Sequence, residues 1–228
     1  MNIYGLQKMT LLDYPGRVAC TVFLGGCDMR CPWCHNSELV NMTAEPVMTD
    51  AELMTFLEGR KKLLDGVAVT GGEPLLREEN LELIRNISGM GYPVKLDTNG
   101  THPDRLRRAV EAGWVQYVAM DIKNSPDLYA RTVGLTAVDL SAVRKSVSYL
   151  LEGNVPYEFR TTVVKEFHDE ASMRAIGEWI SGAEKYFLQK FTDRETVAFA
   201  GFHAPDEADM AKWVGFLRQN VKEVEIRG

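Results

Sequence analysis

The sequence has few cysteines, few histidines and no long apolar run. Cysteine and histidine each occur four times in 228 residues. No apolar stretch reaches the length of a membrane span, and the first five residues lack the basic start and apolar core of a secretory signal. We therefore expect a cytoplasmic protein with no membrane partner, in a compartment where disulfides are uncommon.

Positive charge is also scarce. Lys and Arg number 26 against 32 Asp and Glu, which gives a net charge of −6 and a pI of about 5.3. This balance argues against general binding to nucleic acids or anionic membranes. Internal repeats, low-complexity tracts and flexible linkers are absent as well, so we expect residues 1–228 to form a single globular domain.

Three of the four cysteines, Cys27, Cys31 and Cys34, fall within eight residues. Thiolates this close repel one another unless they are protonated, oxidised or bound to a metal. Three sulfur ligands suit an iron–sulfur cluster, in which one iron stays open to an outside ligand, or zinc. Zinc would need His35 as a fourth ligand, but adjacent residues seldom reach one ion. The spacing favours a cluster and leaves zinc and a disulfide open, while Cys20 is interpreted as a buried apolar residue.

Short β-branched runs alternate with helix-periodic segments, a pattern typical of βα units. The predicted strands cover residues 17–25, 66–70, 93–97, 115–122, 157–164 and 185–191, and a helix follows each. The first helix begins at Thr49, where Thr49 and Glu52 fit a capping box. Because a full eight-unit barrel needs about 250 residues, six units in residues 17–220 predict an α/β fold, a partial, laterally open (β/α)6 TIM-like barrel. Residues 1–16 are expected to form an N-terminal extension and residues 221–228 a strand-like tail.

Polar residues gather where the predicted strands end, and the carboxyl ends of parallel strands are where βα folds build their sites. They are Cys27–Cys34, Gly71–Glu73, Asp97, Asp121, Lys123 and Gln189, with Arg160 inside the fifth strand. The convergence of five such segments is stronger support for a site than any one motif.

Taken singly, several of these residues have a simpler structural explanation. A glycine pair is most often a turn, Asp97 before Thr-Asn-Gly fits an Asx turn, and Lys123 fits an ordinary surface lysine. Asp121 and Arg160 are different because they interrupt apolar strands, where an unpaired charge is costly. Opposite charges are tolerated there when they pair or bind a polar ligand, so we expect a charged small molecule inside the barrel.

The remaining histidines carry no predicted function. His102, His168 and His203 lie in predicted loops or at helix starts, and each is interpreted as a surface or capping residue.

The spacing Cys27-x3-Cys31-x2-Cys34, with Trp33 before the last cysteine, resembles the signature of the radical S-adenosylmethionine (radical SAM) superfamily. Gly71–Pro74 resembles the glycine-rich motif of that family. The segments 97–100 and 121–123 resemble those of glycyl-radical-enzyme activases, including the pyruvate formate-lyase activases. Residues 5–36 are most similar to the activases of anaerobic ribonucleoside-triphosphate reductases. The resemblance covers nearly the whole chain, and the family's six-unit partial barrel agrees with the unit count.

The resemblance implies a cofactor set and a reaction. The three clustered cysteines would hold three irons of a [4Fe-4S] cluster, and S-adenosylmethionine would chelate the fourth. With an electron from a flavodoxin or ferredoxin, S-adenosylmethionine would yield a 5′-deoxyadenosyl radical. That radical would take hydrogen from a glycine of a partner glycyl-radical enzyme.

The resemblance also implies which residues bind the cofactor. Backbone groups of the glycine motif would hold the methionine end, an aromatic and a histidine would line the adenosyl side, and a monovalent cation would lie near two carboxylates. The predicted cofactor-binding residues are Trp33, His35, Gly71, Gly72, Glu73, Asp97, Asp121, Lys123, Arg160 and Gln189.

Two departures limit the resemblance. Pyruvate formate-lyase activases have a cofactor-contacting histidine after strand six, where residues 189–191 here offer none, and no cysteine follows Cys34 to hold a second cluster. The partner therefore stays open. The expected partner is an anaerobic ribonucleotide reductase. The alternatives are pyruvate formate-lyase, another glycyl-radical enzyme, and a small-molecule substrate as in deazaguanine synthases. A zinc-binding interaction module is the alternative from a different class.

Overall fold

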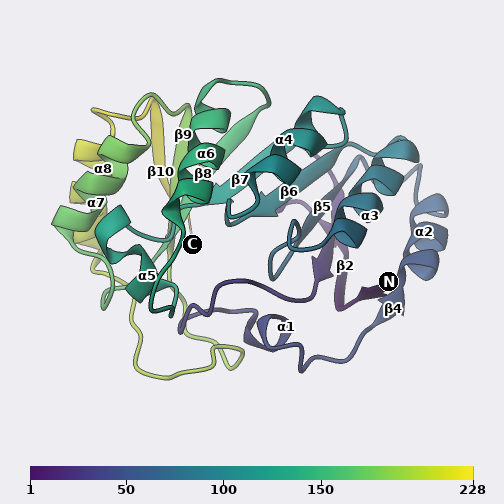
Figure 1. Ribbon diagram of the computed structural model, residues 1–228, viewed down its shortest axis with the longest axis horizontal. Coiled ribbons are helices and arrows are strands. Elements are labelled where there is room, and N and C mark those ends of the chain that lie inside the picture. The colour runs from purple at the N-terminus through teal and green to yellow at the C-terminus, as the bar shows by residue number, and fades with distance from the viewer. Residues whose placement is uncertain (228) are drawn as a thin grey trace. The chain divides into compact units, whose positions relative to one another are not determined.

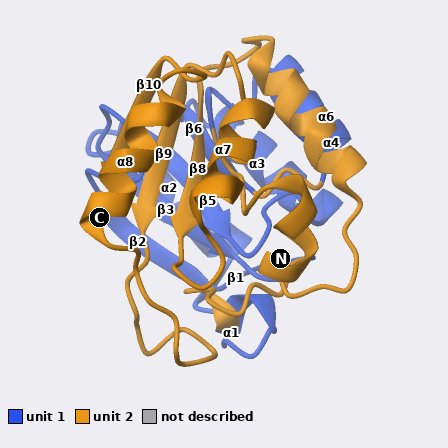
Figure 2. Ribbon diagram, turned by 90° about the vertical axis from the view of Figure 1, so that its left-hand side faces the viewer, with its two compact units in different colours: residues 1–28, 38–98, 102–118 blue, residues 29–37, 99–101, 119–228 orange. Residues whose placement is uncertain are grey.

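The computed structural model describes residues 1–227. Contacts within the chain divide it into two compact units. The first comprises residues 1–28, 38–98 and 102–118, and the second comprises residues 29–37, 99–101 and 119 onward. Figure 2 shows the first unit in blue and the second in orange.

In the first unit, three parallel strands carry the sheet, and β2 pairs with β3 in the antiparallel direction. The strands are β2 (Gly5–Thr10), β3 (Ala19–Leu24), β5 (Gly66–Gly71) and β6 (Val94–Thr98), in the order β2-β3-β5-β6. Two short strands, β1 (Asn2–Ile3) and β4 (Met48–Thr49), form a separate antiparallel pair. The N-terminal extension therefore contains strands.

The helices of the first unit follow its strands. They are α2 (Asp50–Glu58), α3 (Glu78–Gly89) and α4 (Pro103–Glu111), while the single turn α1 (Ser37–Val40) crosses the boundary between the units. The predicted capping box at the start of α2 is confirmed, because Thr49 and Glu52 bond each other's backbone. Pro103 opens α4, where its missing N–H costs nothing. In Figure 1, α3 and α4 lie side by side over β5 and β6.

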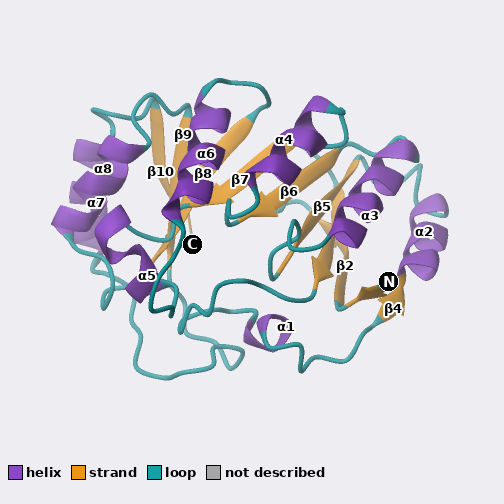
Figure 3. Cartoon of the chain, in the orientation of Figure 1, coloured by secondary structure: helices purple, strands orange, loops and turns teal. Residues whose placement is uncertain are grey.

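The second unit repeats the same alternation. Its parallel strands are the end of β7 (Tyr117–Asp121), β8 (Tyr157–Val163), β9 (Lys185–Lys190) and β10 (Glu223–Arg227), in that order. Its helices are a 3-10 turn (Pro126–Leu128), α5 (Tyr129–Thr132), α6 (Leu140–Leu151), α7 (Glu170–Trp179) and α8 (Glu207–Leu217). Helices α7 and α8 pack against each other, as Figure 3 shows.

The six predicted strands are all present, each within two residues of its expected start, and the tail is the strand β10. The predicted apolar faces of the helices point into the core, for example Ile84 and Ile87 in α3 and Val143 and Val147 in α6. Within residues 1–227, β2 pairs only with β3 and β10 only with β9, so the strands do not close into a barrel. None of the described helices is long and apolar enough to cross a membrane.

Candidate active site

The glycine motif at the end of β5 packs tightly against the segment that leads to the first cysteine. Gly72 N–H donates to the Leu24 carbonyl at 2.9 Å, and Glu73 N–H donates to the Gly26 carbonyl at 2.8 Å. A Cβ added to Gly72 would lie 2.0 Å from the Gly26 oxygen, and Gly71 has a φ of +125°. Only glycine fits both positions, so the motif is required by close backbone approach as well as by a turn.

Glu73 itself is a structural member of the motif. Its side chain is fully buried, and one carboxylate oxygen accepts hydrogen bonds from Leu75 N–H at 2.9 Å and from the Thr98 hydroxyl at 2.8 Å. These bonds tie the turn after β5 to the end of β6. The backbone of the motif is thereby held in place by its own acidic side chain.

Asp97, near the end of β6, is paired with a lysine that sequence reasoning missed. Lys95 is 2% exposed and donates from Nζ to Asp97 Oδ1. A lysine within a buried strand requires such a partner, because an unpaired charge there is costly. The alternation in Val94–Thr98 carried this signal, since it places Lys95 and Asp97 on the same face of β6.

Cys27 lies in the first unit, directly before an acidic residue. Its thiol contacts Asp28 Oδ1 at 3.8 Å, and the other oxygen of Asp28 lies 3.2 Å from His102 Nε2. His102 precedes α4 without capping it through its side chain. The histidine thus pairs with a loop carboxylate instead of capping the helix.

In the second unit, Asp121 forms ion pairs with Lys123 and Arg160. A charge that interrupts an apolar strand was expected to need such a partner. Lys123 Nζ donates to Asp121 Oδ2 at 2.9 Å, and Arg160 donates to Oδ1 through Nε at 3.0 Å. Burial alone would raise the pKa of Asp121, but Arg160 and Lys123 outweigh it and lower the pKa to about 2. Burial alone would lower the pKa of Lys123, yet the charge of Asp121 raises it above its ordinary value. All three groups are therefore charged at neutral pH.

This charged group lies beside two residues of the cysteine motif. The Lys123 ammonium is 5.5 Å from the centre of the Trp33 ring, and Cys31 packs against the buried cluster of Trp33, Val164 and Phe191. Burial raises the pKa of the Cys31 thiol to about 11, although Lys123 acts in the opposite direction. A metal would reverse this shift, since a coordinating thiol loses its proton.

Trp33 and His35 occupy different environments. Trp33 is 4% exposed, and its indole Nε1 has no hydrogen-bond partner within residues 1–227. His35 stacks on Phe191 with ring centres 5.4 Å apart, and its Nε2 lies 2.6 Å from the Thr192 carbonyl oxygen. That contact occupies one of the two ring nitrogens through which a histidine can bind zinc.

Of the last two predicted residues, both in the second unit, Arg160 lies in the middle of β8 and Gln189 lies near the end of β9. Arg160 is held by Asp121, and Gln189 Oε1 accepts a 3.5 Å hydrogen bond from the Thr162 hydroxyl. Because β8 and β9 are paired with Thr162 opposite Gln189, the two side chains share one face of the sheet.

The interpretation of His168 as a surface or capping residue is wrong. His168 is 4% exposed, and its ring Nδ1 accepts a hydrogen bond from Val164 N–H at 3.1 Å. This leaves Nε2 as the donor to the Lys123 carbonyl, 2.9 Å away. Nearby, the buried Asn124 donates to the Phe167 carbonyl at 2.8 Å. These two residues fix the backbone that carries Lys123, and nothing in their local sequence indicated it.

The residues of the cysteine motif fit an iron–sulfur cluster. All of its cysteines are free thiols rather than disulfides. No three His, Cys, Asp or Glu side chains in residues 1–227 are grouped to hold a single metal ion. A cluster does not need that convergence, because each cysteine binds a different iron. The unsatisfied indole of Trp33 is in keeping with a bound group.

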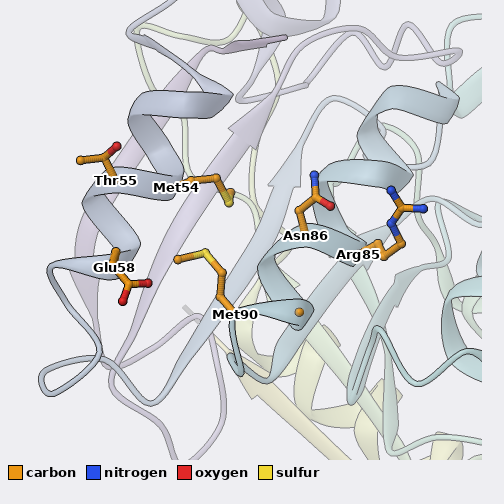
Figure 4. A pocket seen from close by; sticks show the side chains of 7 residues that line it. Met54, Thr55, Glu58, Arg85, Asn86 and Met90 are labelled. Carbon is orange, nitrogen blue, oxygen red and sulfur yellow. The ribbon is translucent and has the colours of Figure 1, made fainter.

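A large groove in the first unit lies away from these residues. It measures about 740 Å³ and runs between α2 and α3, where Met54 and Met90 face each other with Glu58 and Arg85 at the sides (Figure 4). None of its lining residues belongs to the predicted site.

The comparison with family models identifies the superfamily of this chain. Residues 21–176, more than half of the chain, match the model described as the radical SAM superfamily. The chain belongs to the radical SAM superfamily. The matched range contains the three cysteines, the glycine motif and the charged group around Asp121. As a radical SAM protein it uses a [4Fe-4S] cluster and S-adenosylmethionine, as predicted.

Two curated relatives are named as activating enzymes. A Methanocaldococcus jannaschii protein, named by inference as a glycyl-radical enzyme activating enzyme, is 27% identical over 99% of this chain and 95% of its own length. The pyruvate formate-lyase-activating enzyme of Clostridium pasteurianum is 35% identical over 55% of this chain and 54% of its own length.

Solved structures share the fold at low identity. Streptococcus suis SuiB bound to S-adenosylmethionine has a TM-score of 0.70 at 12% identity, covering 91% of this chain and 52% of that chain. A domain of a pyruvate-formate lyase-activating enzyme from Bacteroides vulgatus has a TM-score of 0.58 at 17% identity, covering 72% of this chain and 99% of that chain. The radical SAM fold predicted from the sequence is confirmed.

Proposed function

We propose that this protein is an activase that generates a glycyl radical on a separate enzyme, with an anaerobic ribonucleoside-triphosphate reductase as the leading partner. The observation that carries the proposal is the likeness, along 99% of this chain, to the Methanocaldococcus jannaschii protein that is named as a glycyl-radical enzyme activating enzyme. The choice of reductase rests on the resemblance of residues 5–36, and pyruvate formate-lyase or another glycyl-radical enzyme is the alternative. A flavodoxin or ferredoxin is the proposed electron donor.

Within this function, each part of the site has a proposed role. The cysteines at positions 27, 31 and 34 hold the cluster, and together with S-adenosylmethionine it supplies a 5′-deoxyadenosyl radical when bound. The backbone of residues 71–73 binds the methionine end. Trp33 and His35 line the part of the site that holds the adenosyl group of S-adenosylmethionine, and Gln189 lies at the edge of that part.

The charged residues bind and orient the cofactor. Two cations share one carboxylate at Asp121, so the group keeps an excess of positive charge that suits the carboxylate of S-adenosylmethionine. Asp97 remains a predicted cofactor contact, with a monovalent cation near it and Asp121.

A small-molecule reaction is the second candidate. The 7-carboxy-7-deazaguanine synthase of Synechocystis is 33% identical over 40% of this chain and 42% of its own length. The shorter match makes this candidate weaker than the activase.

The test is anaerobic radical transfer. The reduced protein, S-adenosylmethionine and the candidate reductase are mixed, and electron paramagnetic resonance is recorded. We expect a glycyl doublet together with 5′-deoxyadenosine, and neither product with a Cys31→Ala variant. Deoxyadenosine formed without a protein radical, for every glycyl-radical enzyme tried, would refute the activase and favour a small-molecule substrate.

A further inference from the structure

A polar pocket lies in the first unit at the start of α3, and none of its lining residues is a predicted cofactor ligand. It measures about 450 Å³, within the range of pockets that bind ligands. Its lining residues are Met1, Asn2, Tyr4, Gly25, Arg77, Glu79 and Asn80.

Asn80 gives this pocket an unsatisfied hydrogen-bond donor. The side chain is 4% exposed, and its Nδ2 has no partner within residues 1–227. Buried polar groups nearly always have a partner, so an acceptor supplied from outside the chain is expected here.

Charge at the pocket favours an anionic acceptor. Arg77 is the N-cap residue of α3, and no side chain caps this helix. Its guanidinium forms no ion pair among the described residues, and the helix N-terminus adds partial positive charge beside it. Asn80, in the same first turn, thus lies next to two sources of positive potential.

Glu79 indicates that the occupant of this pocket is not a simple anion. It lines the same pocket, is exposed, and forms no ion pair in the part of the chain that the structure describes. A free inorganic anion would be repelled by this carboxylate. A polypeptide can offer a carboxylate to Arg77 and Asn80 and an N–H group or a cation to Glu79.

The pocket also adjoins the segment that carries the first cysteine. Gly25 is one of its walls, and a Cβ added to Gly26 would lie 3.5 Å from Arg77 Nη2. Cys27 follows directly. A polypeptide held in this pocket is therefore close to the loop that the proposed function assigns to the cluster.

We propose that this pocket receives an acidic side chain of the glycyl-radical partner and so forms part of its docking surface. The inference rests on the proposed function. Arg77 and Asn80 bind the carboxylate, and Glu79 selects a polypeptide over a free anion.

The test compares partner KM with turnover, using the cluster-loaded protein. We expect Arg77→Gln and Asn80→Leu each to raise the KM for the partner about tenfold, the usual cost of losing a bond to a charged group. Turnover at saturating partner and S-adenosylmethionine cleavage without partner stay unchanged. Glu79→Gln should allow inorganic phosphate to compete with the partner, a gain that misfolding cannot produce.

Arg85→Gln is the matched control, since Arg85 is an exposed arginine of the same helix that lines the other groove. It should leave the KM unchanged. Inorganic phosphate, which Glu79 repels, should not compete with the partner in the wild type.

The outcomes separate this inference from the function on which it rests. Deoxyadenosine without any glycyl radical in the wild type would refute the proposed function. Radical transfer by Arg77→Gln and Asn80→Leu at the wild-type KM would refute only the docking pocket. Phosphate that binds the pocket without changing the partner's KM would also overturn it and leave a site for small anions.

Discussion

Asp121 shows how one side chain organises the charged part of the second unit. Its two oxygens each accept from a different cation, Lys123 on one and Arg160 on the other. The side chains of all three residues are at most 26% exposed, so water screens their interaction only in part. Removing the carboxylate would leave two cations facing each other without compensation.

We predict that Asp121→Ala weakens S-adenosylmethionine binding and leaves the cluster in place. Asp121 fixes the positions of Lys123 and Arg160. Without it the two cations repel each other and no longer present their charges to the cofactor carboxylate, so the affinity should fall about tenfold, the usual cost of losing a bond to a charged group. Anaerobic calorimetry measures the affinity, and iron content measures the cluster. Asp206→Ala is the control, because Asp206 is 72% exposed and forms its ion pair with a surface lysine, Lys165, at 3.4 Å. Equal affinity of wild type and Asp121→Ala would exclude this role.

Cysteine substitutions separate the cluster ligands from the structural thiol. We predict that Ala at position 27, 31 or 34 abolishes cluster assembly, and that Cys20→Ala does not. Cys20 is fully buried in β3, where burial raises its pKa to about 12 and keeps the thiol protonated. Iron content and absorbance after anaerobic reconstitution check the prediction. The ligand assignment is wrong if Cys31→Ala keeps its cluster and Cys20→Ala loses it.

At the scale of elements, the turn between β5 and α3 links several parts of the first unit. Its backbone bonds reach Leu24 and Gly26, while the Glu73 carboxylate reaches Thr98 at the end of β6. A change in this turn must therefore move the segment before Cys27. The two glycines act through backbone position, which is why side chains are excluded at positions 71 and 72.

We predict that Gly72→Ala destabilises the protein by about 1–3 kcal/mol, the usual cost of overpacking, and lowers cluster occupancy. The added Cβ meets a backbone oxygen, which cannot turn aside as a flexible side chain could. Gly89→Ala is the matched control, since it lies in α3 with nothing within 4 Å of an added Cβ. It should raise stability by up to about 1 kcal/mol. Urea unfolding measures both variants, and equal midpoints for them would contradict the packing argument.

For the whole molecule, the buried His168 predicts a loss of stability in weak acid. Burial lowers its pKa in the folded state, although its hydrogen bonds to Lys123 and Val164 act in the opposite direction. The unfolded chain then binds a proton that the folded chain does not, so stability is present above a pH of about 6.5 and falls below it.

The expected slope is at most about 1.4 kcal/mol per pH unit. Anaerobic urea unfolding between pH 7.5 and pH 5 measures it, with His168→Gln as the comparison because glutamine keeps a donor for the Lys123 carbonyl. An unchanged slope in this variant would show that His168 is not the titrating group. A second decline at lower pH is expected from carboxylates with a lowered pKa, such as Asp121 and Asp169, whose contribution is lost as they become protonated.

The sequence by itself determined the features that depend on local patterns. Cysteine spacing indicated the cluster, alternation located the six strands, and Thr49 with Glu52 marked the start of α2, because neighbouring residues alone decide these features. It also indicated that Asp121 needs a partner, since a lone carboxylate in an apolar strand is costly.

Only the tertiary structure decided which distant groups meet. Arg160 reaches Asp121 from 39 residues away, and His168 is buried against the Lys123 carbonyl 45 residues away. The sequence also did not indicate the unsatisfied amide of Asn80, because the helical pattern of α3 does not show which residues cover its first turn. Burial and pairing depend on how the strands and helices of each unit pack, and no local pattern encodes that.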